Sequence, residues 1–337
     1  MAGWERRRAV RIVVAGAGAL GSVLGGYFAL AGEEVTLIGR PAHVESIRTR
    51  GLQVDGVRGP HVVRTLRAVV DPREVEAADL LILCVKSQDT PDALEGLAHL
   101  RGKVGMAISL QNGGRKDEQL AEAFGADAVV GAATLVGASM PEPGRVLHTG
   151  KAGTWIGEFT GATSPRVEQA ASVFRKSDLP IEIRPDIRSV IWCKLNQMVP
   201  AASIACVTRL ALHEIYLAPE LAALFVELSR EVAQIAERRS VPLEDFPGFA
   251  VRSVCTAPFE AAVQSVIARG RTLVEKGMTQ VRISTLQDLE RGKPTEAEET
   301  IGYVVGLARQ LGLAIPKLEV LYRIIQGIEE AHRARCA

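Results

Sequence analysis

The chain has 337 residues, of which 47% are hydrophobic and 23% are charged, and its formal net charge is +1. This length exceeds a typical single domain, so we expect two domains with sizeable cores. The near-neutral charge gives no support for binding to nucleic acid or to a membrane surface. The five cysteines are scattered, without a CxxC pair or a Cys/His cluster. They predict neither a disulfide framework nor a metal site, and a cytoplasmic location without a signal peptide is expected.

The first half of the chain alternates strand-like and helix-like segments. A buried strand is predicted at 9–15, a helix of small residues at 19–31 and a second strand at 34–38. The uncharged segment 12–32 has about the length of a membrane span, but its glycines favour a strand, a turn and a helix instead. Further strands are predicted within 52–70 and at 80–85, 104–110, 128–136, 146, 154 and 179–184, further helices at 44–50, between 85 and 104, and at 165–175, and a turn at 140–144.

This alternation is typical of a doubly wound parallel sheet, so an α/β domain of the Rossmann type is expected at 1–185. Strand signals nearly vanish after Pro185, and long helix-period stretches follow. An all-helical domain is therefore predicted at 186–337. The Pro- and Phe-rich region 242–258 interrupts it, either as a partner surface or as a pocket lid, and the sequence does not choose between these.

The turn after the first strand reads Gly16-Ala17-Gly18-Ala19-Leu20-Gly21. Gly16 allows a tight bend, Gly18 lets the backbone approach a pyrophosphate, and Gly21 allows close packing of the helix on the strand. The helix N-terminus that starts at Ala19 and Leu20 offers free N–H groups to an anion. A dinucleotide site is predicted here; the alternative is a glycine-rich packing turn without a ligand.

The end of the second strand bears on the choice of dinucleotide. It reads Leu37-Ile38-Gly39-Arg40, without the acidic residue that would hydrogen-bond the ribose hydroxyls of NAD. Arg40 can instead bind the 2′-phosphate of NADP, a contact worth about 1.5–3 kcal/mol. We therefore predict NADP(H), with a solvated loop arginine as the alternative.

Four further signatures follow at characteristic positions. They are Val85-Lys86-Ser87, Leu110-Gln111-Asn112-Gly113, Trp192-Cys193-Lys194-Leu195, and Ser284-Thr285-Leu286-Gln287-Asp288 ahead of Pro294-Thr295-Glu296. Together with the glycine turn, they make nearly the whole chain resemble the ketopantoate reductase (2-dehydropantoate 2-reductase) family. The resemblance implies NADPH-dependent reduction of a small 2-keto acid, 2-dehydropantoate to pantoate in pantothenate biosynthesis, between a Rossmann domain and a helical domain.

The resemblance also implies roles for individual residues. Lys194 matches the catalytic lysine, which gives a proton to the substrate carbonyl oxygen as hydride arrives. Glu296 matches the carboxylate that binds substrate and orients the lysine. Asn112 matches an asparagine near nicotinamide and substrate, Lys86 a lysine near the cofactor, and Ser284 a serine that contacts substrate.

Each of these residues also has a purely structural interpretation. Lys194 can be a surface lysine of a helix, and Asn112 can serve the turn that Asn-Gly favours. Thr295 and Glu298 fit a capping box, which would make Glu296 a first-turn acid that stabilises the helix dipole. Ser284 can be a plain helix-start serine.

The chain departs from the family pattern beside the lysine. Many members carry asparagines four and eight residues after it, on the same helix face, where this chain has Met198 and Ala202. Asn196 is only two residues on and should point elsewhere. Since a lost hydrogen bond to a substrate hydroxyl costs about 0.5–1.5 kcal/mol, the substrate site lined by Met198 and Ala202 can prefer a more apolar 2-keto acid.

Two other functions remain open. A β-hydroxyacid dehydrogenase also joins a Rossmann domain to helices with a catalytic lysine, but Lys194 is not followed by the expected asparagine pair. A non-catalytic NADP sensor would need the glycine turn and Arg40 but neither Lys194 nor Glu296. The helical domain can also contribute to a homodimer, although the sequence does not fix the oligomeric state.

Overall fold

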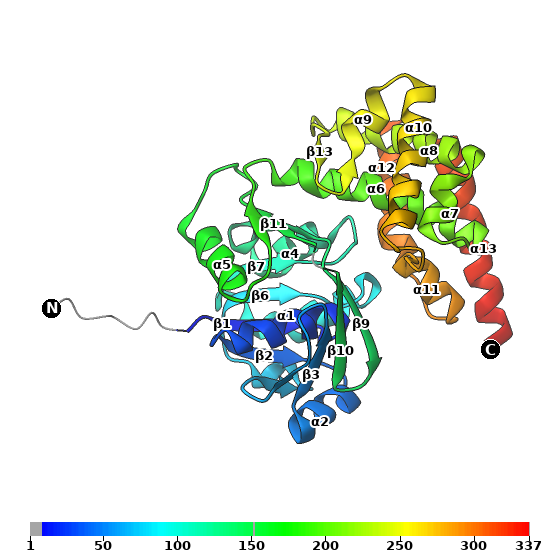
Figure 1. Ribbon diagram of the computed structural model, residues 1–337. Coiled ribbons are helices and arrows are strands. Elements are labelled where there is room, and N and C mark those ends of the chain that lie inside the picture. The colour runs from blue at the N-terminus through cyan, green and yellow to red at the C-terminus, as the bar shows by residue number, and fades with distance from the viewer. Residues whose placement is uncertain (1–8, 151, 337) are drawn as a thin grey trace. The chain divides into compact units, whose positions relative to one another are not determined.

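The computed structural model describes residues 9–150 and 152–336 (Figure 1). They form two compact units. The first runs up to Gln111 and includes Lys116–Ile187, and the second consists of Asn112–Arg115 and the chain from Arg188 onward. A four-residue loop that follows the last strand of the first unit's main sheet is therefore grouped with the second unit.

The main sheet of the first unit is parallel throughout, as predicted. Its five strands lie in the order β5 (Arg67–Val69), β2 (Glu34–Ile38), β1 (Arg11–Ala15), β6 (Ala78–Leu83) and β7 (Val104–Ser109). The direction in which successive strands are added reverses at β1: β2 lies on one side of it and β6 on the other. The last residue of β1, Ala15, pairs with Ile38 of β2 and with Leu83 of β6. Parallel strands end at the same edge, so the loops after β1, β2 and β6 are neighbours there.

Helices cover both faces of this sheet, which makes the unit doubly wound. In β1, Ile12 and Val14 belong to a hydrophobic cluster with residues of α1 and α5, whereas Val13 and Ala15 belong to a second cluster with residues of α3 and α4. Alternate residues of a strand point to opposite faces, so the two clusters are the two faces of the sheet. The helices are α1 (Ala19–Leu30), α2 (Pro41–Arg50), α3 (Thr90–Gly96), α4 (Lys116–Phe124) and α5 (Pro165–Lys176), and the short 3₁₀ turns are η1 (Pro72–Glu74), η2 (Ser87–Asp89), η3 (Ala98–Leu100) and η4 (Ala126–Ala128).

The remaining strands of the first unit form two mixed sheets, which the expectation of one doubly wound sheet did not anticipate. One has the order β4 (His61–Val63), β3 (Leu52–Gly56), β10 (Arg145–Gly150) and β9 (Gly137–Glu142), and the other β12 (Ile181–Ile183), β11 (Thr154–Gly157) and β8 (Gly131–Thr134). The turn predicted at 140–144 is shorter than expected, because β9 continues to Glu142. Pro141 is tolerated there since β9 is an edge strand.

The second unit is built from helices around one hydrophobic cluster. It contains α6 (Ile187–Thr208), α7 (Leu212–Leu217), α8 (Pro219–Arg238), α9 (Val251–Thr256), α10 (Phe259–Glu275), α11 (Ser284–Glu290), the π-helical turn η5 (Glu298–Gly302), α12 (Tyr303–Leu311) and α13 (Pro316–Cys336). The region 242–258 is less irregular than predicted, since it holds the hairpin β13 (Asp245–Phe246) and β14 (Phe249–Ala250) and then α9.

Among the described residues, one helix is long and apolar enough to cross a membrane, and it is α6 rather than the segment at 12–32. The apolar window of α6 has a mean hydropathy of 1.3, and 78% of it is buried inside the protein. Its apolar side chains belong to the cluster of the second unit, among them Leu195, Val199 and Ile204. The hydropathy of α6 is therefore that of a core helix.

Candidate active site

Three loops meet at the carboxyl edge of the parallel sheet. The N–H groups of Gly16 and Ala17 donate to the carbonyl of Ile38 at 3.1 and 2.8 Å, which fixes the first turn against the end of β2. On the other side, the N–H of Cys84 donates to the carbonyl of Ala15 at 2.7 Å. The glycine turn is thus bonded to both neighbouring strand ends, as the topology requires for a ligand site at this edge.

The glycines of this turn fit a dinucleotide. Gly16 has a φ of +106°, and a Cβ there would lie 2.4 Å from the backbone nitrogen of Val85. A Cβ at Gly21 would lie 2.3 Å from the carbonyl oxygen of Gly16. Gly18 differs, because apart from its own atoms and those of its chain neighbours no described atom lies within 4 Å of its Cβ position.

Gly18 is also the N-cap of α1, and within the described chain no side chain caps the helix there. The first turn of α1 contains no acidic residue, so its N–H groups, from Ala19 onward, face the open side of the turn with the positive end of the helix dipole. An open helix N-terminus beside a glycine with a vacant Cβ position suits a pyrophosphate.

Arg40 lies beside this turn. It is the N-cap residue of α2, and the Cβ position of Gly39 is 2.8 Å from the Cβ of Ala17, so the loops after β1 and β2 approach closely. The side chain of Arg40 is 88% exposed, and its Nη2 lies 3.5 Å from Oδ2 of Asp89. Asp89 ends η2, which follows β6 and whose N-cap is the half-buried Lys86. The sequence signatures did not single out Asp89.

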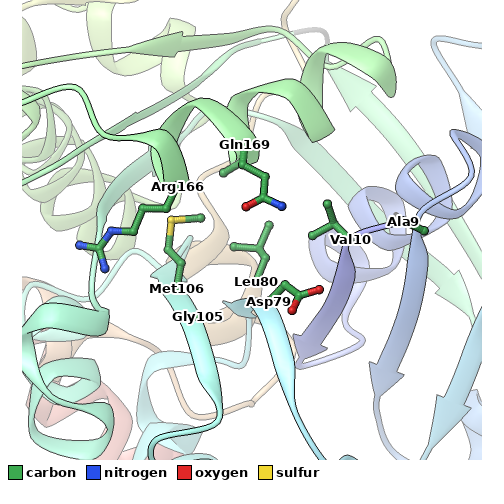
Figure 2. Close-up of a pocket in the computed structure, with 9 residues that line it drawn as sticks. Ala9, Val10, Asp79, Leu80, Gly105, Met106, Arg166 and Gln169 are labelled. Atoms are coloured by element: carbon green, nitrogen blue, oxygen red, sulfur yellow. The ribbon is translucent and has the colours of Figure 1, made fainter. Parts of the chain in front are cut away.

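A separate cavity of about 330 Å³ lies at the opposite edge of the sheet. Figure 2 shows it at the starts of β1, β6 and β7, with Arg166 and Gln169 of α5 on its other side. Its charged groups already have partners, since Arg166 pairs with Glu158 at 2.8 Å and Asp79 pairs with Arg11 at 2.7 Å. Ligands of such sheets bind at the carboxyl edge, so this cavity is not the candidate active site.

In the second unit, the two predicted catalytic residues are both buried. Lys194 on α6 is 7% exposed and Glu296 is 4% exposed, although charged side chains are rarely buried without compensation. Their chain neighbours Leu195 and Ala297 belong to the same hydrophobic cluster. The interpretation of Lys194 as a surface lysine is therefore wrong.

The predicted capping box is also wrong. The hydroxyl of Thr295 accepts from the N–H of Ala297 at 3.1 Å and donates to Glu329, while the carboxylate of Glu298 accepts from the hydroxyl of Tyr322. The backbone N–H of Thr295, which Glu298 would accept from in a capping box, donates to Glu329 at 3.3 Å, and Glu298 begins the π-helical turn η5. The carbonyl of Glu296 instead accepts the first helical bond, from the N–H of Thr300 at 3.1 Å.

The loop that carries Asn112 is anchored on this π-helical turn. The N–H of Gly114 donates to the carbonyl of Glu299 at 2.8 Å. A Cβ at Gly114 would lie 2.0 Å from Cδ1 of the Tyr303 ring, so only glycine fits this contact. Asn112 itself is half-buried, and the anchor ties its loop to the helix that follows Glu296. π-Helical turns are frequent at functional sites.

The remaining predicted substrate residues lie on three helical positions. Ser284 is the first residue of α11 and, within the described chain, makes no capping bond. Ala202 is 3% exposed in the hydrophobic cluster, and Met198 is half-buried one turn before it. The amide of Asn196 donates to the carbonyl of Ser229 at 2.8 Å, so it points toward α8.

Two polar residues near the Asn112 loop have structural roles that the sequence signatures missed. The amide of Gln111 donates to the carbonyl of Val85 at 2.9 Å and to the hydroxyl of Thr90 at 2.7 Å, which ties the end of β7 to the loop after β6. Lys116 is buried and donates to the carbonyls of Ser109 and Ala132. Both stiffen the strand ends from which the Asn112 loop leaves the sheet.

Comparison with known proteins shows the family to which the chain belongs. The model of the N-terminal domain of the ketopantoate reductase PanE/ApbA family matches residues 12–161, and the model of its C-terminal domain matches residues 186–329. The chain belongs to the ketopantoate reductase family. It is thus an oxidoreductase. The family resemblance that its sequence motifs indicated is confirmed over most of the chain.

Relatives within the ketopantoate reductase family align over nearly full length. The chain is 30% identical to the 2-dehydropantoate 2-reductase of Pyrococcus abyssi, covering 95% of this chain and 98% of that protein. It is 31% identical to the enzyme of the same name from Halobacterium salinarum, covering 94% and 98%.

Solved structures agree on the fold. A PanE/ApbA family ketopantoate reductase from Ralstonia eutropha superposes with a TM-score of 0.81 at 28% identity, covering 96% of this chain and 99% of that one. The ternary structure of D-mandelate dehydrogenase with NADH and anilino(oxo)acetate has the same TM-score at 20% identity, covering 96% and 99%, and shows the shared fold alone.

Proposed function

We propose that this ketopantoate reductase family member reduces 2-dehydropantoate to pantoate with NADPH. The observation that carries the proposal is the burial of Lys194 and Glu296, two opposite charges, in one helical unit that also holds the Asn112 loop. A fold maintained for packing alone gains little from such charges, because burying them costs free energy. A site that must move a proton needs them.

NADPH, when bound, supplies the hydride. The first-turn N–H groups of α1, beginning at Ala19, would hold its pyrophosphate, and Gly16, Gly18 and Gly21 leave room for it. Arg40 would bind the 2′-phosphate, and Lys86 would lie beside the cofactor at the end of the neighbouring strand. We assign residues 1–185 to cofactor binding and 186–337 to substrate binding and catalysis.

Lys194 acts as the proton donor. Its ammonium group gives a proton to the carbonyl oxygen of the substrate and stabilises the negative charge that develops there. Glu296 orients that ammonium group and binds the substrate, while Asn112 and Ser284 hydrogen-bond the keto acid. Lys194 is only 7% exposed, and polar contacts are stronger where little water reaches them.

A second candidate substrate is a more apolar 2-keto acid. The observation that favours it is the position of Ala202 within the hydrophobic cluster, with Met198 one turn before it on the same face as Lys194. Neither side chain can donate a hydrogen bond to the substrate hydroxyl of 2-dehydropantoate. The two substrates can both react, because hydrophobic pockets discriminate weakly between isosteres.

The test is oxidation of NADPH by the purified protein with 2-dehydropantoate, ketoisovalerate and a bulkier branched 2-keto acid. Lys194→Ala should lower kcat by about 10²–10⁴-fold without weakening NADPH binding. Lys293→Ala, an exposed lysine of the same unit, is the matched control and should leave kcat unchanged. The ranking of kcat/KM values decides between the two substrates. Tight NADPH binding without turnover of any 2-keto acid would contradict the proposal and favour a sensor.

A further inference from the structure

We propose that Asp89 determines how strongly this enzyme distinguishes NADPH from NADH, an inference that rests on the assignment of Arg40 to the 2′-phosphate. The Asp89 carboxylate competes with that phosphate for Arg40. It also offers an acceptor to the 2′-hydroxyl of NADH. The preference for NADPH over NADH is therefore weaker than Arg40 alone would give.

The topology places Asp89 where a ribose-binding acid is useful. Arg40 follows β2 and Asp89 ends the 3₁₀ turn after β6, and these two strands flank β1 at the carboxyl edge of the sheet. The acid that binds the ribose of NAD usually stands at the end of the second strand, where this chain has none. Here the loop after β6 provides a carboxylate on the other side of the glycine turn.

The geometry of the Arg40–Asp89 pair indicates that Asp89 competes with the phosphate for Arg40 and does not hold Arg40 in place for it. Nη2 of Arg40 and Oδ2 of Asp89 are 3.5 Å apart, longer than the 2.7–2.9 Å of a charge-assisted hydrogen bond. The side chains are 88% and 46% exposed, so the pair holds Arg40 only loosely and both groups are accessible to a ligand. A carboxylate this close to Arg40 would repel the phosphate that Arg40 binds.

The variant Asp89→Asn tests this because it removes the charge and keeps the size of the side chain. We expect NADPH and the fragment 2′,5′-ADP to bind about two- to fivefold more tightly, as loss of a competing exposed ion pair predicts. NADH should bind no more tightly, so the NADPH-to-NADH selectivity rises. The gain for 2′,5′-ADP should shrink at high salt, since screening weakens exposed charges.

The measurement is calorimetric titration of full-length protein with 2′,5′-ADP and 5′-AMP, together with kcat/KM for both coenzymes. The set comprises the wild type, Asp89→Asn, Arg40→Ala and the double variant, so that the coupling between the two residues is obtained directly. Asp92→Asn, an exposed acid in the first turn of α3, is the matched control and should change neither affinity. In the Arg40→Ala background, Asp89→Asn should have a smaller effect on 2′,5′-ADP.

The outcomes separate this inference from the proposed function. If Arg40→Ala abolishes the preference for NADPH while Asp89→Asn leaves 2′,5′-ADP binding unchanged or weakens it, the inference is overturned and the coenzyme assignment stands. If Arg40→Ala leaves the preference unchanged, the coenzyme assignment itself fails, and the role of Asp89 fails with it.

Discussion

At the scale of single residues, Glu299 is a half-buried acid with one carboxylate oxygen that is fully buried. Within the described chain, its Oε2 is buried and has no hydrogen-bond partner. Burial raises the pKa of this carboxyl, and the nearby carboxylates of Glu298 and Glu296 raise it further. The folded state therefore binds the Glu299 proton more tightly than the unfolded state does, and stability present at low pH is lost as the pH rises through the folded pKa.

Replacing Glu299 with glutamine removes this loss. We expect Glu299→Gln to raise the free energy of unfolding by up to about 1 kcal/mol at neutral pH, since an amide has no ionised form to bury. The gain should vanish below the ordinary pKa of a glutamate, where both proteins are uncharged at this position. Urea unfolding between pH 4 and 8 measures it. Glu330→Gln, an exposed acid on α13, should show little pH-dependent gain, and an equal gain there would contradict the explanation.

The motif residues of the site could be found in the sequence, but their surroundings could not. Lys194 and Glu296 stand in recognisable signatures, whereas nothing local distinguishes Asp89 from other exposed acids. Its contact with Arg40 joins two loops that only the order of the strands brings together. Likewise, Lys194 looked like an ordinary helix lysine, because burial depends on what packs against the helix.

At the scale of elements, the π-helical turn η5 and the loop Asn112–Arg115 are packed and hydrogen-bonded to each other. A methyl group at Gly114 would overlap the ring of Tyr303, and the N–H of Gly114 binds the carbonyl of Glu299. We expect Gly114→Ala to displace the loop and with it Asn112, and to lower kcat by about 10- to 100-fold, as small misplacements of positioning groups do.

Coenzyme affinity should change much less than kcat in Gly114→Ala, because the glycine turn proposed to bind the pyrophosphate belongs to the first unit and not to the unit of Gly114. Gly306→Ala on α12 is the control: apart from its chain neighbours and the nearby backbone of α12, no described atom lies within 4 Å of its Cβ position, and alanine favours the helix. Steady-state kinetics and 2′,5′-ADP titration compare the two variants. Full activity of Gly114→Ala would show that the loop tolerates the side chain and does not position Asn112.

Hydrophobic periodicity predicted the positions of the helices and strands better than it predicted which strands pair with each other. The segments of β1, α1, β2 and α5 were predicted within two residues of their observed ends, because each is a simple apolar pattern bounded by glycine or proline. The sheets to which the later strands belong were not predictable, since pairing joins distant segments such as β3 and β10. The π-helical turn was missed because Thr295 and Glu298 have the spacing of an ordinary capping box.

At the scale of the whole molecule, each unit has a hydrophobic core made of its own residues. The cluster of the helical unit draws on residues from Trp192 to Ile325, and the two clusters of the first unit lie between Val10 and Leu179. One cluster of each unit contains an edge-to-face aromatic pair, Phe28 with Phe174 at 5.0 Å in the first unit and Tyr216 with Phe225 at 5.2 Å in the helical unit. These pairs allow the same chemical deletion to be made once in each unit.

We expect Phe174→Ala and Phe225→Ala each to cost about 3–5 kcal/mol, because both rings are fully buried. In scanning calorimetry, Phe174→Ala should lower the melting temperature of the first unit, and Phe225→Ala should lower that of the helical unit. Adding 2′,5′-ADP at about 100 times its Kd stabilises the unit that binds it by about 2.7 kcal/mol. It should therefore raise the melting temperature of the first unit, which Phe174→Ala lowers. The melting temperature of the helical unit, which Phe225→Ala lowers, should not change. A single transition that responds equally to both variants and to the ligand would mean that the two cores unfold together.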